Sequence, residues 1–141
     1  MRYPVDAKWS NIFHLTSSGN EEHKGQRYPA VWANREKKFH ICFYVDENTY
    51  HCITYNYQLH KSYHFVISQL YNSKREASYE INVNGETFHE VINRAPSKFK
   101  NVKLFLSDPW YPSFASYGLL SNFKINDFKP NDRSEQNPTG K

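Results

Sequence analysis

The stretch YEINVNGETFHEV, residues 79–91, carries the clearest structural signal in the 141-residue chain. Apolar and polar residues alternate on both sides of Asn84-Gly85. Alternation with a period of two is typical of a β-strand that has one buried face. Asn-Gly readily adopts the positive φ angles of a two-residue hairpin turn. The stretch therefore predicts two antiparallel strands, Tyr79–Val83 and Thr87–Val91, joined by that turn.

The same alternation continues outward from this hairpin in both directions, and no segment of useful length has the period of a helix. Pro29 places Tyr28–Ala33 at a sheet edge or at a strand start, and Tyr63–Leu70 is expected to be the most buried strand. The polar segment 16–26 predicts a long loop, and residues 130–141 predict a disordered tail or linker. The other predicted strands are Trp9–Thr16, Phe39–Val45, Tyr50–Tyr57, Val102–Leu106 and Leu119–Phe128.

The composition fits one all-β domain, which we place at residues 1–129. Aromatic residues make up 17% of the chain, with eleven Tyr and ten Phe, and such side chains suit strands with one wet face. We expect two antiparallel sheets stacked about 10 Å apart as a sandwich. The side chains expected between the sheets are Phe13, Leu15, Phe43, Ile53, Phe65, Ile67, Ile81, Val83, Leu104, Leu106, Phe123 and Ile125.

Charge and hydropathy argue against two classes of partner. The formal net charge is only +4, and the Lys and Arg residues are scattered rather than gathered in the stripe typical of a nucleic-acid binder. No run approaches the roughly 20 apolar residues that a membrane-spanning helix needs. The residues after Met1 lack the apolar core of a signal peptide. We therefore expect the sequence to be a mature or excised piece if the protein is secreted.

The two cysteines, Cys42 and Cys52, lie in the predicted hairpin of Phe39–Val45 and Tyr50–Tyr57. A four-residue turn centred on Glu47 would place them opposite each other, at a separation that suits a disulfide. A disulfide would indicate an oxidising, secreted environment. Two alternatives remain at this point: a zinc site that adds His40 to the two cysteines, or a pair of buried reduced thiols.

Three motifs in order resemble the laminin-G-like or concanavalin-A-like jelly roll. They are Tyr63–Ser68 (YHFVIS), Ile81–Glu86 (INVNGE) and Gly118–Ile125 (GLLSNFKI). The resemblance implies a two-sheet antiparallel jelly-roll sandwich from a multidomain extracellular protein. It also implies calcium as a ligand, with Asp108 as the candidate metal residue. This architecture hosts lectins, adhesion modules and glycosidases, so it does not specify one function.

Catalytic patterns are weak in the sequence. Jelly-roll glycosidases need two carboxylates facing one cleft, but Glu76 and Glu80 lie at a predicted turn and a strand start. The seven histidines lie outside the known hydrolase motifs. We therefore expect a protein that is not an enzyme, and a glycoside hydrolase is the last of the alternatives.

Aromatic residues give the best candidates for ligand binding, because sugars pack their apolar faces on aromatic rings. One group lies in the late loop, where the rival interpretation is that the aromatic side chains plug one end of the sandwich. Another group lies in the cysteine hairpin, where the rival interpretation is cross-strand packing. We expect a recognition or adhesion module for a cell-surface or matrix glycan or protein, binding through loops at one sandwich edge. The alternatives are a lectin with an aromatic platform and a spacer without a ligand. The candidate ligand-binding residues are Trp110, Tyr111, Asp108, Tyr117, Tyr44 and Tyr50.

Overall fold

The computed structural model describes residues 9–19, 27–72, 75–107 and 119–126, and these contain strands but no helix. The predicted domain boundary at residue 129 and the predicted tail 130–141 lie outside the described residues. The strands are β1 (Trp9–Thr16), β2 (Ala30–Asn34), β3 (Lys38–Val45), β4 (Asn48–Asn56), β5 (Phe65–Tyr71), β6 (Ala77–Val83), β7 (Glu86–Asn93) and β8 (Lys103–Leu106).

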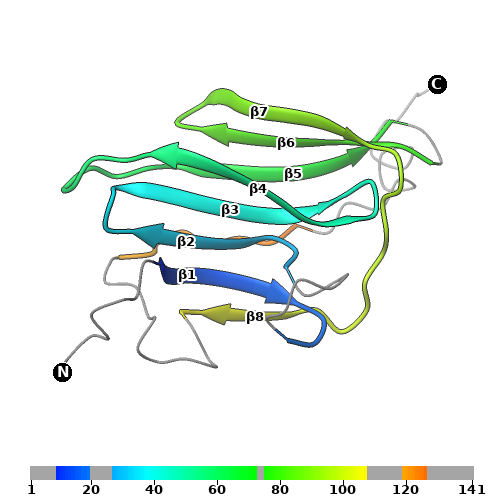
Figure 1. Ribbon diagram of the computed structural model, residues 1–141, viewed down its shortest axis with the longest axis horizontal. Helices are drawn as coiled ribbons and strands as arrows, with labels where there is room; N and C mark the ends of the chain where they lie inside the picture. The colour runs from blue at the N-terminus through cyan, green and yellow to red at the C-terminus, as the bar shows by residue number, and fades with distance from the viewer. Residues whose placement is uncertain (1–8, 20–26, 73–74, 108–118, 127–141) are drawn as a thin grey trace, which may run out of the picture.

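The strands form two antiparallel sheets (Figure 1). One has five strands in the order β4-β3-β2-β1-β8, and the other has three strands in the order β5-β6-β7. Residues 94–102 run from the end of β7 to β8, which pairs with β1 at the far edge of the larger sheet. The prediction of an all-β fold with two antiparallel sheets is thus confirmed.

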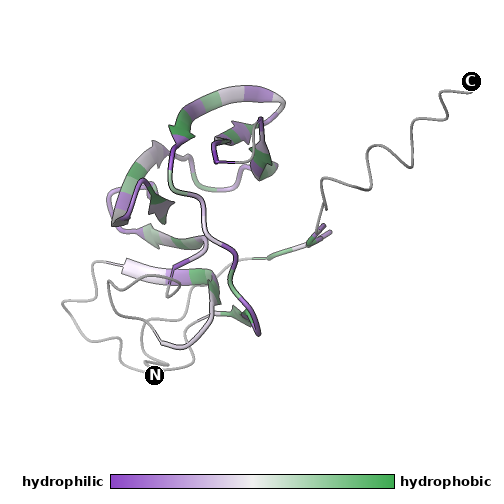
Figure 2. Ribbon diagram, turned by 90° about the vertical axis from the view of Figure 1, so that its right-hand side faces the viewer, coloured by the Kyte–Doolittle hydropathy of each residue, from purple (hydrophilic) through white to green (hydrophobic). Residues whose placement is uncertain are grey.

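The hydrophobic core lies between the sheets. The rings of Phe43 and Tyr79 stack across it, with centroids 3.8 Å apart and planes 8° from parallel. Apolar and polar residues alternate along the strand ribbons, so each strand turns one side to this core (Figure 2). Burial also raises the pKa of the Tyr79 hydroxyl well above its ordinary value. The buried core residues are Val31, Ile41, Phe43, Val45, Tyr79, Ile81 and Val83.

The core contains most of the side chains expected from the sequence, with exceptions at its margin. Phe43, Ile81 and Val83 are buried as predicted. Leu106 and Ile125 are both 58% exposed, so their assignment to the core was wrong. Leu106 lies at the end of the edge strand β8, where the three-stranded sheet does not cover it.

Two predictions about individual strands are corrected, and one is confirmed. The most buried strand of the small sheet is the central β6, in which every second residue is buried, whereas β5 is an edge strand. The position of Pro29 is confirmed: it lies directly before the first residue of β2, at the strand start, which is the second of the two predicted alternatives, and β2 lies inside its sheet. Residues 119–126 form no strand. Phe123 nevertheless packs edge-on against Phe13 of β1, with ring centroids 5.3 Å apart.

Two of the hairpin turns, β6–β7 and β3–β4, each have two residues with positive φ. Asn84 and Gly85 have φ of 53° and 87°, as the Asn-Gly signal predicts. Asp46 and Glu47 have φ of 49° and 63° and join β3 directly to β4, so the predicted four-residue turn is wrong. Positive φ is costly for residues other than glycine, so the second turn needs contacts elsewhere to hold it.

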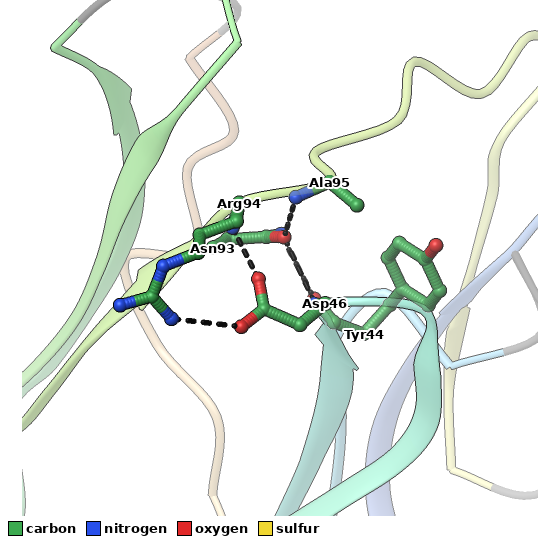
Figure 3. A network of polar contacts seen from close by, with 5 residues as sticks. All are labelled: Tyr44, Asp46, Asn93, Arg94 and Ala95. Carbon is green, nitrogen blue, oxygen red and sulfur yellow. Dashed lines mark hydrogen bonds and ion pairs between the residues drawn. The ribbon is translucent and has the colours of Figure 1, made fainter.

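Asn93, at the end of β7, supplies such contacts from the other sheet (Figure 3). Its Oδ1 accepts the backbone N–H of Asp46 at 3.0 Å, and its Nδ2 donates to the carbonyl of Tyr44 at 3.3 Å. The carboxylate of Asp46 accepts the backbone N–H of Arg94, and its other oxygen lies 3.4 Å from the Arg94 guanidinium. Since Asn93 is fully buried, these bonds replace water that the turn would otherwise bind.

We expect Asn93→Ala to lower the free energy of unfolding by about 2–3 kcal/mol, because it leaves buried backbone groups without partners. Urea denaturation measures this loss. Asn56→Ala, at an exposed position at the end of β4, is the matched control and should change stability little. Equal stability of the two variants would contradict the role given to Asn93.

Candidate functional site

Four of the six candidate ligand-binding residues lie outside the described residues: Asp108, Trp110, Tyr111 and Tyr117. Their binding roles, and the calcium site expected at Asp108, stay predictions. Tyr50 lies in β4, and the structure describes its backbone but not its side chain.

Tyr44 is placed in the interior. It is only 2% exposed and packs edge-on against Phe99, with ring centroids 6.2 Å apart. Its burial leaves it no surface for a ligand. The register between β3 and β4 also shifts here, from Phe43 opposite His51 to Val45 opposite Asn48, so Tyr44 and Tyr50 lie in the irregular part of the hairpin.

The disulfide Cys42–Cys52 is present, with an S–S distance of 2.02 Å and Cα atoms 4.2 Å apart. The two cysteines are directly opposite each other in the β3–β4 register. A ring nitrogen of His40 and the two sulfurs lie within 4.8 Å of one another, so the residues of the zinc alternative do converge. Zinc binds thiolates, however, and these sulfurs are bonded to each other. The disulfide is weakly consistent with an extracellular location.

Aromatic rings enclose the disulfide on the side of the large sheet that faces away from the core. Trp32 is 8% exposed and clusters with Ala30 and Cys42. His40 lies between Trp9 and Trp32, with ring centroids 4.5 and 6.1 Å away. Burial, and secondly the charge of Arg27, lower the pKa of His40. This cluster is therefore a second apolar packing layer around the disulfide.

The side of the three-stranded sheet that faces away from the core, here called the outer face, carries a regular array of polar groups. Strand pairing sets its side chains in three rows across β5, β6 and β7. Glu80 and Glu90 are direct neighbours in the middle row. Polar groups therefore fill the centre of the array, and three of its four corners are apolar: Val66, Leu70 and Ile92. The rows are Leu70-Ser78-Ile92, Ser68-Glu80-Glu90 and Val66-Asn82-Thr87.

Hydrogen bonds fix the polar side chains of the outer face. Glu80 Oε1 accepts from Asn82 Nδ2 at 2.5 Å and from Thr87 Oγ1 at 2.7 Å. Glu90 Oε1 accepts from Ser78 Oγ at 3.0 Å. These bonds restrict the rotamers of the five side chains before any ligand arrives, so less entropy is lost on binding.

The outer face is also unbalanced in charge. Like charges directly opposite each other on neighbouring strands are unfavourable, yet among the described residues neither Glu80 nor Glu90 forms an ion pair. Val66 and Leu70, on the same face of the edge strand β5, are 45% and 42% exposed. Within the described part of the chain, this surface thus combines negative charge that lacks an ion-pair partner with accessible apolar area.

Sequence reasoning missed this array because of a β-bulge. Regular pairing around the Asn84–Gly85 turn would place His89 opposite Glu80. The register shifts between Ile81 and Asn82 instead, so His89 lies opposite Ile81 and Glu90 opposite Glu80. The alternation of Ser78, Glu80 and Asn82 was the signal for half of the array, but nothing in the alternation marked the extra residue in β7.

The bulge also brings His89 to His51 of β4, across the seam between the sheets. Their Nε2 atoms are 3.3 Å apart, and their ring centroids 5.4 Å apart. The Phe43 ring lies 4.8 Å from the His51 ring and 6.0 Å from the His89 ring. Burial lowers the pKa of both histidines. The negative charge of Asp46 partly opposes the lowering at His51, whereas His51 lowers the pKa of His89 further.

Comparison with known proteins gives no relative: no family model, curated protein or solved structure matches the chain. Within the described residues there is also no helix long and apolar enough to cross a membrane.

The histidine pair predicts that stability falls as the pH is lowered. An unfolded histidine has a pKa of about 6.5, and the folded values of His51 and His89 are lower. The unfolded chain therefore binds more protons, so stability is lost progressively as the pH falls below about 7. Urea unfolding between pH 8 and pH 5, with EDTA present, measures this dependence.

His89→Gln should remove part of the pH dependence, and His64→Gln, at an exposed position before β5, should leave it unchanged. His51 and His40 contribute in the same direction, so part of the pH dependence remains in this variant. A pH dependence that is identical in the wild type and in His89→Gln would show that the pair does not titrate as stated.

Proposed function

We propose that this chain is an extracellular recognition or adhesion module that binds a glycan or protein of the cell surface or matrix. Within this proposal its sandwich is a jelly roll of the kind that the laminin-G-like motifs resemble. The observation that carries the proposal is the outer face, where fixed polar side chains surround two carboxylates without ion-pair partners among the described residues.

The outer face offers what a recognition surface needs. Its carboxylate and amide groups are held in place by one another, so they meet a ligand already oriented. Glu80 and Glu90, which have no ion-pair partner among the described residues, favour a ligand that presents hydrogen-bond donors or positive charge, while exposed Val66 and Leu70 favour apolar contact beside them. The late loop with Trp110 and Tyr111 remains the second proposed contact region.

Extracellular placement is supported by the disulfide, which persists where thiols are oxidised. A role in binding is preferred to catalysis for a physical reason. A glycosidase needs one carboxyl group kept protonated by an apolar pocket, whereas Glu90 is exposed on a sheet surface. The glycoside hydrolase therefore remains the last alternative.

A dedicated lectin is the second candidate. The observation that favours it is the mixture of hydroxyl, amide and carboxylate groups on one face, where Ser78 is bonded to Glu90, and Asn82 and Thr87 are bonded to Glu80. Sugar hydroxyls both donate and accept hydrogen bonds, and such a mixture can satisfy both.

We expect the double variant Glu80→Gln, Glu90→Gln to bind intact cells and extracted matrix at least about tenfold more weakly, the equivalent of about 1.4 kcal/mol. Glutamine keeps the size of the side chain and removes its charge. Flow cytometry with labelled protein measures the loss. Glu36→Gln, at an exposed position between β2 and β3, is the matched control. Trp110→Ala and Tyr111→Ala test the late loop in the same assay.

Enzymatic removal of surface glycans separates the two candidates: binding lost with the glycans supports the lectin, and binding retained supports a protein partner. Binding that neither the outer-face nor the loop variants weaken would refute the proposed surfaces. Hydrolysis of a polysaccharide that is lost in the double variant would instead establish an enzyme.

A further inference from the structure

We propose that His51 and His89 together form a binding site for a divalent transition-metal ion, with Zn²⁺ as the ion named. The site would lie between the edge strand β4 of the large sheet and the edge strand β7 of the small sheet. It is separate from the outer face, because His89 and Glu90 are consecutive in β7 and therefore point to opposite sides of the strand.

The separation of the two nitrogens carries the inference. Zinc binds imidazole nitrogen at about 2.0–2.1 Å, and tetrahedral geometry then holds two such nitrogens about 3.3–3.4 Å apart. The two Nε2 atoms are 3.3 Å apart before any ion is bound. An ion can therefore be accommodated with little movement of either ring. The separation also fits a hydrogen bond between the two rings, which is the arrangement that the ion would replace.

Metal binding does not change the number of protons on the two histidine rings. Two neutral imidazoles that face each other through Nε2 share a single Nε2–H, which one donates to the other. On metal binding that proton moves to Nδ1 of the same ring, so each histidine stays neutral and offers an Nε2 lone pair. Burial favours the neutral form of both rings.

The backbone and the neighbouring side chains hold both histidines in place. His51 is paired with Phe43 in the β3–β4 register, and His89 is paired with Ile81 in the β6–β7 register. Both rings pack beside the Phe43 ring. The carboxylate of Asp46 is close enough to act electrostatically on His51, and its negative charge favours a cation there. Both histidines are only partly buried, so water can complete the coordination shell.

Because its two ligands come from different sheets, the ion should resist their separation. With tag-free, oxidised protein freed of metal by EDTA and dialysis, we expect one Zn²⁺ per chain by isothermal titration calorimetry. At about ten times the measured dissociation constant, the melting temperature should rise by roughly 3–6 °C. In NMR spectra, the imidazole signals of His51 and His89 should shift on titration.

His51→Gln and His89→Gln should each abolish the temperature rise, and His64→Gln should retain it. Where a glutamine variant is poorly folded by circular dichroism, the NMR titration of the wild type decides alone. The proposal is overturned if no ion binds, if binding survives both glutamine substitutions, or if binding appears only after the Cys42–Cys52 bond is reduced. The last result would place the ion at His40 and the freed thiolates.

Discussion

Contact between the two sheets is the interaction on which the rest of the structure depends. Neither sheet can bury its apolar side alone, and the Phe43–Tyr79 stack lies in the layer where they meet. The positions of other important residues depend on this contact between the sheets. His51 and His89 border the Phe43 ring at the strand edges, and Asn93 joins the end of β7 to the β3–β4 hairpin.

In the β3–β4 turn, contacts with residues far away in the sequence offset the conformational cost of two positive φ angles. Asp46 and Glu47 hold positive φ angles that neither residue prefers. The compensating bonds come from Asn93 and Arg94, more than forty positions later in the chain and in the other sheet. The hairpin that contains the disulfide therefore reaches its observed shape only when the sheets are together, so this part of the fold is set by tertiary contacts rather than by local preference.

The sequence was sufficient where a rule acts locally. Alternation located eight of the nine predicted strands, Asn84-Gly85 located a turn, and opposed positions located the Cys42–Cys52 bond. It failed where distant contacts decide. Leu119–Phe128 has strand-like alternation, but its described part packs without joining a sheet. The outer face and the histidine pair escaped prediction because both require knowing which strands are neighbours and where the register shifts.

The bulge in β7 links the outer face to the histidine pair, because it sets the orientation of both Glu90 and His89. One additional residue in that strand decides the side on which everything after it, up to Asn93, emerges. If the same residues paired regularly, without the bulge, His89 would turn toward solvent and Glu90 toward the interior. The pairing of Glu90 with Glu80 and the approach of His89 to His51 therefore depend on the same local irregularity, and a change that straightened β7 would abolish both at once.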